Sequence, residues 1–130
     1  MRLLLDTHVA IWATRMPQRL SHRVRTAIED PDNDVFVSVV AIWETAIKFP
    51  LGRPDGPPFS AFQAIAEFER ADFDLLEVRA VHAALVERLP AIHADPFDRL
   101  MLAQALVEDL QLVTVDRHLL RYDARFFSWT

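Results

Sequence analysis

Short apolar runs alternate with longer amphipathic stretches along this sequence. The short runs are rich in leucine, β-branched or aromatic residues, as buried strands are, and they occupy 2–6, 35–38, 73–78 and 112–115. In the stretches between them, apolar residues recur every three or four positions. This spacing predicts helices at about 7–14, 22–29, 38–49, 59–71, 80–89 and 96–109, and we also expect a helical turn at 116–120 and a short last strand at 126–129. Strands that alternate with helices predict an α/β fold, a three-layer α/β/α sandwich with a central, mainly parallel sheet.

Turn and capping residues fall between these elements. Asp6 or Thr7 is expected to cap the first helix, Ser21 the second, and Pro50 closes the helix at 38–49. The stretch 51–58 contains both glycines and three of the eight prolines, and we interpret it as a surface loop within one domain spanning 1–130. A chain of 130 residues is of ordinary size for a single domain.

Composition narrows the class of protein. With 52% hydrophobic and 25% charged residues the chain is globular, and no apolar run approaches the roughly 20 residues of a membrane span. The N-terminus lacks the pattern of a signal peptide, and there is no cysteine for disulfides or thiolate metal sites. We therefore expect a cytoplasmic protein without a membrane partner. The net charge of −5 argues against a protein that coats DNA, although not against a nucleic-acid enzyme whose acids bind cations.

Two acids directly follow predicted strands. Asp6 ends the run Leu3-Leu4-Leu5, and Asp116 ends the run 112–115. Either could simply be a helix cap. Together, however, they are predicted to lie at the same carboxyl edge of a parallel sheet, where ligands bind in open α/β folds.

Two further acids lie on apolar faces of predicted helices. Glu44 falls between Val40 and Ile47 on its helix, so its carboxylate must be paired, protonated or metal-bound. Asp98 begins the apolar stripe of the helix at 96–109, although a carboxylate in a first turn is also favourable with the helix dipole. We interpret Asp95 as a turn or supporting residue.

The residue types point to a hard cation. Carboxylates without cysteine or paired histidines favour Mg²⁺ or Mn²⁺, which can activate water and assist displacement at phosphorus. His93 and His118 have no partner at ligand spacing, and His8 either orients a neighbouring ligand or packs as an ordinary helix residue. Trp12 and Trp43 are expected in the core. Candidate contacts to phosphate groups are Arg15, Arg19, Arg23, Arg25, Arg99 and Arg117.

Four segments in this order resemble the PIN-domain family, and more closely the VapC-type ribonuclease toxins of type II toxin–antitoxin systems. They are Leu4-Leu5-Asp6-Thr7-His8, Val37 to Glu44, Asp95 to Arg99 with Ala103-Gln104-Ala105, and Leu112 to Arg117. The resemblance implies a Mg²⁺- or Mn²⁺-dependent endoribonuclease with Asp6, Glu44, Asp98 and Asp116 as its catalytic, metal-binding acids. It also implies an RNA substrate, a homodimer, and a cognate antitoxin that covers the site.

Two other classes of protein share some of these features. A phosphoacceptor signalling domain has a similar size and an acidic Mg²⁺ pocket, but it uses a lysine after a late strand, whereas the sole lysine here, Lys48, follows Glu44 in an early helix. A non-catalytic interaction module would use the same acids only in pairs with arginines.

Overall fold

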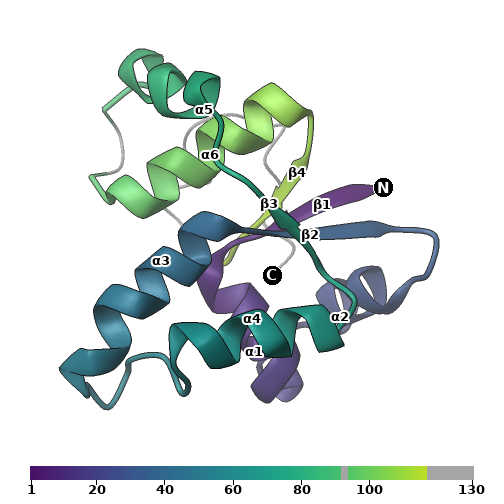
Figure 1. Ribbon diagram of the computed structural model, residues 1–130. Helices are drawn as coiled ribbons and strands as arrows, with labels where there is room; N and C mark the ends of the chain where they lie inside the picture. The colour runs from purple at the N-terminus through teal and green to yellow at the C-terminus, as the bar shows by residue number, and fades with distance from the viewer. Residues whose placement is uncertain (92–93, 117–130) are drawn as a thin grey trace.

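The computed structural model describes residues 1–91 and 94–116, and its centre is a four-stranded sheet. The strands lie side by side in the order β3-β2-β1-β4 and all pair in parallel (Figure 1). They are β1 (Arg2–Leu5), β2 (Asp34–Ser38), β3 (Asp74–Leu76) and β4 (Gln111–Val113). This confirms the predicted parallel sheet. The helical turn and the last strand predicted beyond Asp116 lie outside the described residues.

In the part of the chain that the structure describes, six α-helices connect and cover the strands. They are α1 (Thr7–Arg15), α2 (His22–Glu29), α3 (Val39–Lys48), α4 (Ala61–Arg70), α5 (Ala80–Leu85) and α6 (Pro96–Glu108). Three short 3₁₀ turns follow helices: η1 (Pro17–Arg19), η2 (Phe49–Leu51) and η3 (Val86–Arg88). The helix predicted at 80–89 is thus divided between α5 and η3. Within the described residues, no helix has the length and apolar character needed to cross a membrane.

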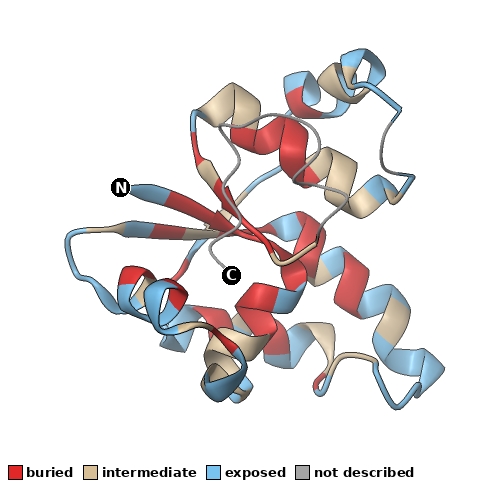
Figure 2. Ribbon diagram, turned by 180° about the vertical axis from the view of Figure 1, so that it is seen from behind, coloured by how far each residue is buried: buried red, intermediate tan, exposed pale blue. Residues whose placement is uncertain are grey.

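Successive strand residues face two different cores. Leu3 and Leu5 pack with α1, α2 and α4 in a first core, whereas Leu4 packs with Met101 and Leu102 of α6 in a second. This alternation follows from the two-residue period of a strand. Most of β1 and the inner sides of the helices are accordingly buried, whereas β3 at the edge of the sheet has no buried residue (Figure 2). Helices on both faces of the sheet confirm the predicted three-layer sandwich.

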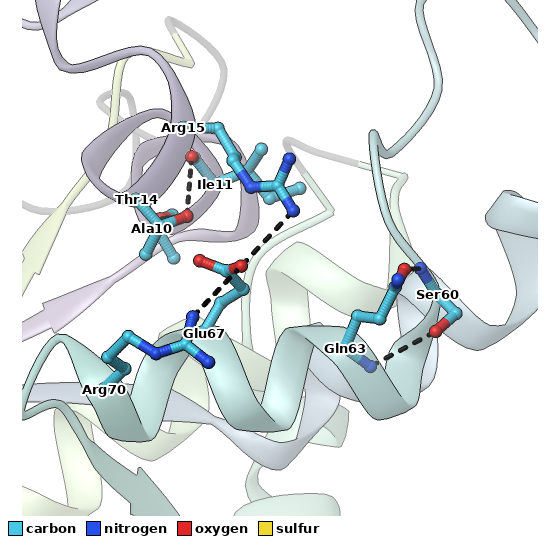
Figure 3. Close-up of polar contacts among 8 residues, drawn as sticks. All are labelled: Ala10, Ile11, Thr14, Arg15, Ser60, Gln63, Glu67 and Arg70. Carbon is cyan, nitrogen blue, oxygen red and sulfur yellow. Dashed lines mark hydrogen bonds and ion pairs between the residues drawn. The ribbon is translucent and has the colours of Figure 1, made fainter.

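Polar side chains cap α4 and link it to α1. Ser60 and Gln63 form a reciprocal capping box at the start of α4 (Figure 3). In the same helix, Glu67 accepts hydrogen bonds from Arg15 of α1 at 3.2 Å and from Arg70 at 3.4 Å. α1 and α4 are therefore linked by an ion pair as well as by the first core.

Two large aromatic side chains on helices are exposed. α4 buries Ala64 and Phe68, and Phe62, two residues from Ala64, is 86% exposed. Trp43 is 54% exposed because α3 buries Val40, Ala41, Glu44 and Thr45, on its other side. The expectation of a core position was wrong for Trp43. Trp12 is half-buried and packs against the first core.

A buried glutamine joins α6 to the ends of two strands. Gln104 is fully buried; its Oε1 accepts from the Ser38 hydroxyl at 2.5 Å, and its Nε2 donates to the Glu77 carbonyl at 3.2 Å. Ser38 also caps α3, since its Oγ accepts from the Val40 N–H at 3.0 Å. This side chain thus fixes α6 against the edge of the sheet from which α3 starts.

Replacement of Gln104 by methionine should lower the free energy of unfolding by about 1–3 kcal/mol. Methionine has a similar volume, so the loss comes mainly from buried polar partners left without a hydrogen bond. Urea denaturation measures the change, with Gln18→Met as the exposed control, for which we expect less than about 0.5 kcal/mol. Equal unfolding midpoints for the two variants would contradict this role.

Candidate metal centre

Asp6 lies where β1 ends and α1 begins. Its side chain is 3% exposed and caps the helix: Oδ1 accepts from the Val9 N–H at 2.9 Å. Oδ2 accepts a short hydrogen bond from the Thr114 hydroxyl, which follows the neighbouring strand β4. Asp6 is therefore a helix cap, as one of the two alternatives predicted. The cap engages only Oδ1 of its two carboxylate oxygens.

Burial raises the pKa of the Asp6 carboxyl above its ordinary value. The hydrogen bonds from Thr114 and Val9 and the charge of His8 oppose this rise, while the nearby Asp116 carboxylate adds to it. The backbone N–H of Asp116 donates to Thr114 Oγ1 at 2.9 Å, so Thr114 connects the two acids. As predicted, the ends of β1 and β4 bring Asp6 and Asp116 together.

Glu44 is buried on α3 and has two partners. Its Oε1 accepts from the Thr7 hydroxyl at 2.7 Å, and its Oε2 accepts from the Lys48 ammonium at 2.5 Å. The Glu44 side chain is 6% exposed and that of Lys48 is 39% exposed. Because Thr7 follows Asp6 directly, this contact places Glu44 beside the end of β1.

Lys48 is the residue of this site that sequence reasoning missed. Burial lowers its pKa, but the hydrogen bond and charge of Glu44, together with the charges of Asp95 and Asp98, raise it by more, so the net shift is upward. The ammonium therefore lies within electrostatic reach of three acids. The four-residue spacing of Glu44 and Lys48 on one helix was the available signal.

The start of α6 contributes the fourth predicted acid. Asp95 caps this helix and accepts from the backbone N–H groups of Phe97 at 2.8 Å and of Asp98 at 3.3 Å. Asp95 therefore has the turn role predicted for it. Asp98 itself is half-buried in the first turn.

The acids are thus grouped around two connecting residues, Thr114 and Lys48. In residues 1–91 and 94–116, no three acids or histidines are arranged as ligands of one ion, so the assignment of Asp6, Glu44, Asp98 and Asp116 as ligands stays a prediction. Their chemistry suits Mg²⁺ or Mn²⁺, since every donor is a carboxylate oxygen. A cationic group already lies against Glu44.

The arginines and histidines singled out in the sequence lie in several different surroundings. Arg99 donates to the backbone carbonyls of Pro90, Val86 and Leu89, and Arg15 lies over the Phe59 ring in addition to pairing with Glu67, so both have structural partners. Arg23 and Arg25 are exposed on α2 as predicted, and Arg19 lies over Trp12. His8 is exposed beside Trp12. His93, His118 and Arg117 lie outside the described residues.

Known proteins are similar to this chain in sequence and in fold along nearly its whole length. The sequence model of the PIN domain matches residues 3–125. The chain belongs to the PIN domain family. Among its relatives, this PIN domain is 37% identical to Ribonuclease VapC22 of Mycobacterium tuberculosis, over 90% of this chain and 88% of that protein. The resemblance to VapC-type proteins predicted from the sequence is thereby confirmed.

A solved structure shares the fold at low sequence identity. A chain in the crystal structure of VapBC2 from Rickettsia felis, bound to a DNA fragment from their promoter, matches this PIN domain with a TM-score of 0.70. The match has 14% sequence identity and covers 98% of this chain and 97% of that one. It supports the three-layer architecture.

Replacement of Asp6 by asparagine should stabilise the metal-free protein at neutral pH. The raised pKa means that the folded state holds the Asp6 proton more tightly than the unfolded chain does. The wild type should therefore lose stability as pH rises from the ordinary aspartate pKa to the raised one, whereas Asp6→Asn does not titrate there. Asparagine keeps the helix cap.

Urea unfolding in the presence of a chelator, at several pH values from about 3 upward, measures this difference. The advantage of Asp6→Asn should be smallest at the acid end and grow as pH rises. Asp32→Asn, at an exposed turn position, is the matched control. A variant less stable than the wild type at pH 7 would show that the Asp6 carboxylate is stabilising.

Proposed function

We propose that this protein is a VapC-type endoribonuclease that hydrolyses RNA phosphodiester bonds with Mg²⁺ or Mn²⁺, and that it is the toxin of a toxin–antitoxin pair. The observation that carries the proposal is the 37% identity to a named ribonuclease over 90% of the chain. The placement of Asp6 and Asp116 at one edge of the sheet, with Glu44 hydrogen-bonded to Thr7, the residue after Asp6, supports it independently. A cytoplasmic location and a cognate antitoxin belong to the same proposal.

The residues that would hold the metal are Asp6, Glu44, Asp98 and Asp116. One or two divalent ions, when bound, lower the pKa of water and stabilise the charge that develops on the phosphate. The surrounding residues position the carboxylates: Thr114 and the Val9 N–H fix Asp6, and Thr7 fixes one oxygen of Glu44. These contacts leave the acids oriented before substrate arrives, which reduces the cost of reorganisation.

Lys48 has a separate task in this proposal. Clustered carboxylates repel one another, and a bare carboxylate at the buried Glu44 position would be costly. The ammonium at 2.5 Å from Glu44 Oε2 offsets that charge in the protein without metal. It also leaves a positive group at the edge of the site, where a phosphate of the substrate would approach.

Cleavage of single-stranded RNA with Mg²⁺ or Mn²⁺ tests the function. Asp6→Asn should reduce cleavage by at least about 100-fold, because it removes a charged ligand at the centre of the site. Urea unfolding of the same variant, for which we expect higher stability than the wild type without metal, separates a loss of activity from a loss of fold. Glu44→Gln and Asp98→Asn should also lose activity, and Asp32→Asn should retain it.

Activity that survives chelation, or equal cleavage by wild type and Asp6→Asn, would refute the proposed mechanism. Absence of Mn²⁺ binding in calorimetry would favour the non-catalytic interaction module instead. Phosphorylation by a small phosphodonor would favour the phosphoacceptor alternative.

The homodimer is a further part of the proposal, and one face of α3 supports it. Val39, Trp43 and Ile47 lie four residues apart on this helix and are 37%, 54% and 44% exposed; we call them the α3 stripe. Trp43 also contacts the Phe97 ring edge-on, with centroids 5.0 Å apart. An exposed apolar row of this kind is typical of an interface between proteins.

Trp43→Glu should weaken self-association by about tenfold or more, because it places a charge in the middle of the α3 stripe. Light scattering coupled to size-exclusion chromatography, over a range of concentrations, gives the molar mass. Phe62→Glu is the control, since Phe62 is more exposed but lies on α4. A wild type that is monomeric at all concentrations would rule out the homodimer.

A further inference from the structure

A cleft of about 900 Å³ opens beside Glu44 and Lys48. One wall is formed by α1 and the end of η1, and the other by the loop at 53–58. Thr7 and Glu44 line its inner end, so the cleft leads directly to the candidate metal centre. Its volume lies within the range of pockets that hold small organic ligands, and it is much larger than an ion or a water molecule requires. We call it the α1 cleft.

The charges on this cleft favour an anionic ligand. Its basic residues are Arg19, Lys48 and Arg53, and its acids are Glu44 and Asp55. Lys48 and Glu44 pair with each other, whereas neither Arg19 nor Arg53 forms an ion pair within the part of the chain that the structure describes. Once that pair is set aside, the charged groups of the cleft are two guanidinium groups and one carboxylate, that of Asp55, so their net charge is positive. Guanidinium groups bind phosphate in a bidentate manner.

The cleft also has an aromatic wall. The indole of Trp12 is half-buried there, with the Arg19 guanidinium 5.8 Å from its centroid and the His8 ring centroid 6.0 Å away. Single-stranded RNA is bound in this way, by bases that stack on aromatic and guanidinium planes while basic groups hold the phosphates. The exposed Trp43 does not line the cleft, and Trp12 does.

We infer that the α1 cleft binds a nucleotide of single-stranded RNA adjacent to the bond that is cleaved, with a base against Trp12 and backbone phosphate at Arg19 and Arg53. This inference rests on the proposed ribonuclease function and adds a binding subsite to it. The 53–58 loop, which forms the opposite wall, then limits which nucleotide fits against Trp12. An acidic peptide could use the two arginines, but it would make no use of a stacking wall that leads to a metal centre.

Binding of a fluorescein-labelled single-stranded RNA, about ten nucleotides long, tests the inference by anisotropy in a chelator, so that no cleavage is needed. Trp12→Leu keeps an apolar side chain but removes the stacking surface, and it should weaken binding by about tenfold or more. Trp12→Phe should recover most of the affinity. Phe62→Ala, which removes an exposed ring outside the cleft, should change nothing.

Arg53→Gln tests the phosphate contact separately. It should weaken binding and make the slope of log affinity against log salt less negative by about 0.7, the value for one phosphate contact to a single strand. Arg88→Gln, an exposed arginine on η3, is the matched control and should leave the slope unchanged. Thermal unfolding of every variant checks that the fold is intact.

The inference is overturned if RNA does not bind, if all variants bind it equally, or if only a polyglutamate peptide binds in a manner that depends on Trp12. These outcomes are distinct from failure of the proposed function. Binding that depends on Trp12 without metal-dependent cleavage would refute the nuclease and leave the α1 cleft as a site that only binds single-stranded RNA. Cleavage that depends on Asp6 but not on Trp12 or Arg53 would keep the nuclease and refute the subsite.

Discussion

The arrangement of the candidate metal centre depends on a carboxylate that is buried where the first strand ends. Asp6 is removed from water, and its raised pKa shows that the hydrogen bonds from Val9 and Thr114 do not fully offset that burial. The parallel order places β4 directly beside β1, so the residue that follows β4 can reach the residue that follows β1. An antiparallel pairing would place those two ends at opposite edges. The fold thus concentrates negative charge at one edge of the sheet, at a cost to its own stability.

The cost of burying a carboxylate also explains the position of Lys48, the only lysine of the sequence. Glu44 is buried on α3, and its charge requires a partner that the first core cannot supply. Lys48, one turn later, reaches Glu44 from the exposed side, and Asp95 and Asp98 also hold it in its charged form. Any cation that binds at Glu44 must share this carboxylate with the ammonium or displace it. The net charge at this edge of the sheet therefore depends on the Lys48 ammonium as well as on the acids.

Much of the fold follows from local pattern. The bounds of α2, the capping role of Ser21, and the ends of β1 next to Asp6 and of β2 at Ser38 could be predicted because capping residues and two-residue periodicity are local signals. The exposure of Trp43 and Phe62 could not, because periodicity identifies an apolar face but not which part of it a neighbouring element covers. The pair of Glu44 and Lys48 was visible as a spacing. Its importance was not, since burial of Glu44 against Thr7 depends on how the tertiary fold brings α3 to the start of α1.

The α1 cleft and the acid edge, by which we mean Asp6, Glu44, Asp98 and Asp116, are built from different kinds of structure. The acids sit on strand ends and helix starts, where the sheet register and buried hydrogen bonds fix them. The outer wall of the cleft is a loop entered through Gly52, whose φ of +63° favours glycine, so the turn is fixed while the residues that follow are free to vary. Changes in 53–58 would alter the ligand that fits beside Trp12 without disturbing the sheet. The acid edge can therefore keep one reaction while the loop changes the nucleotide that is accepted.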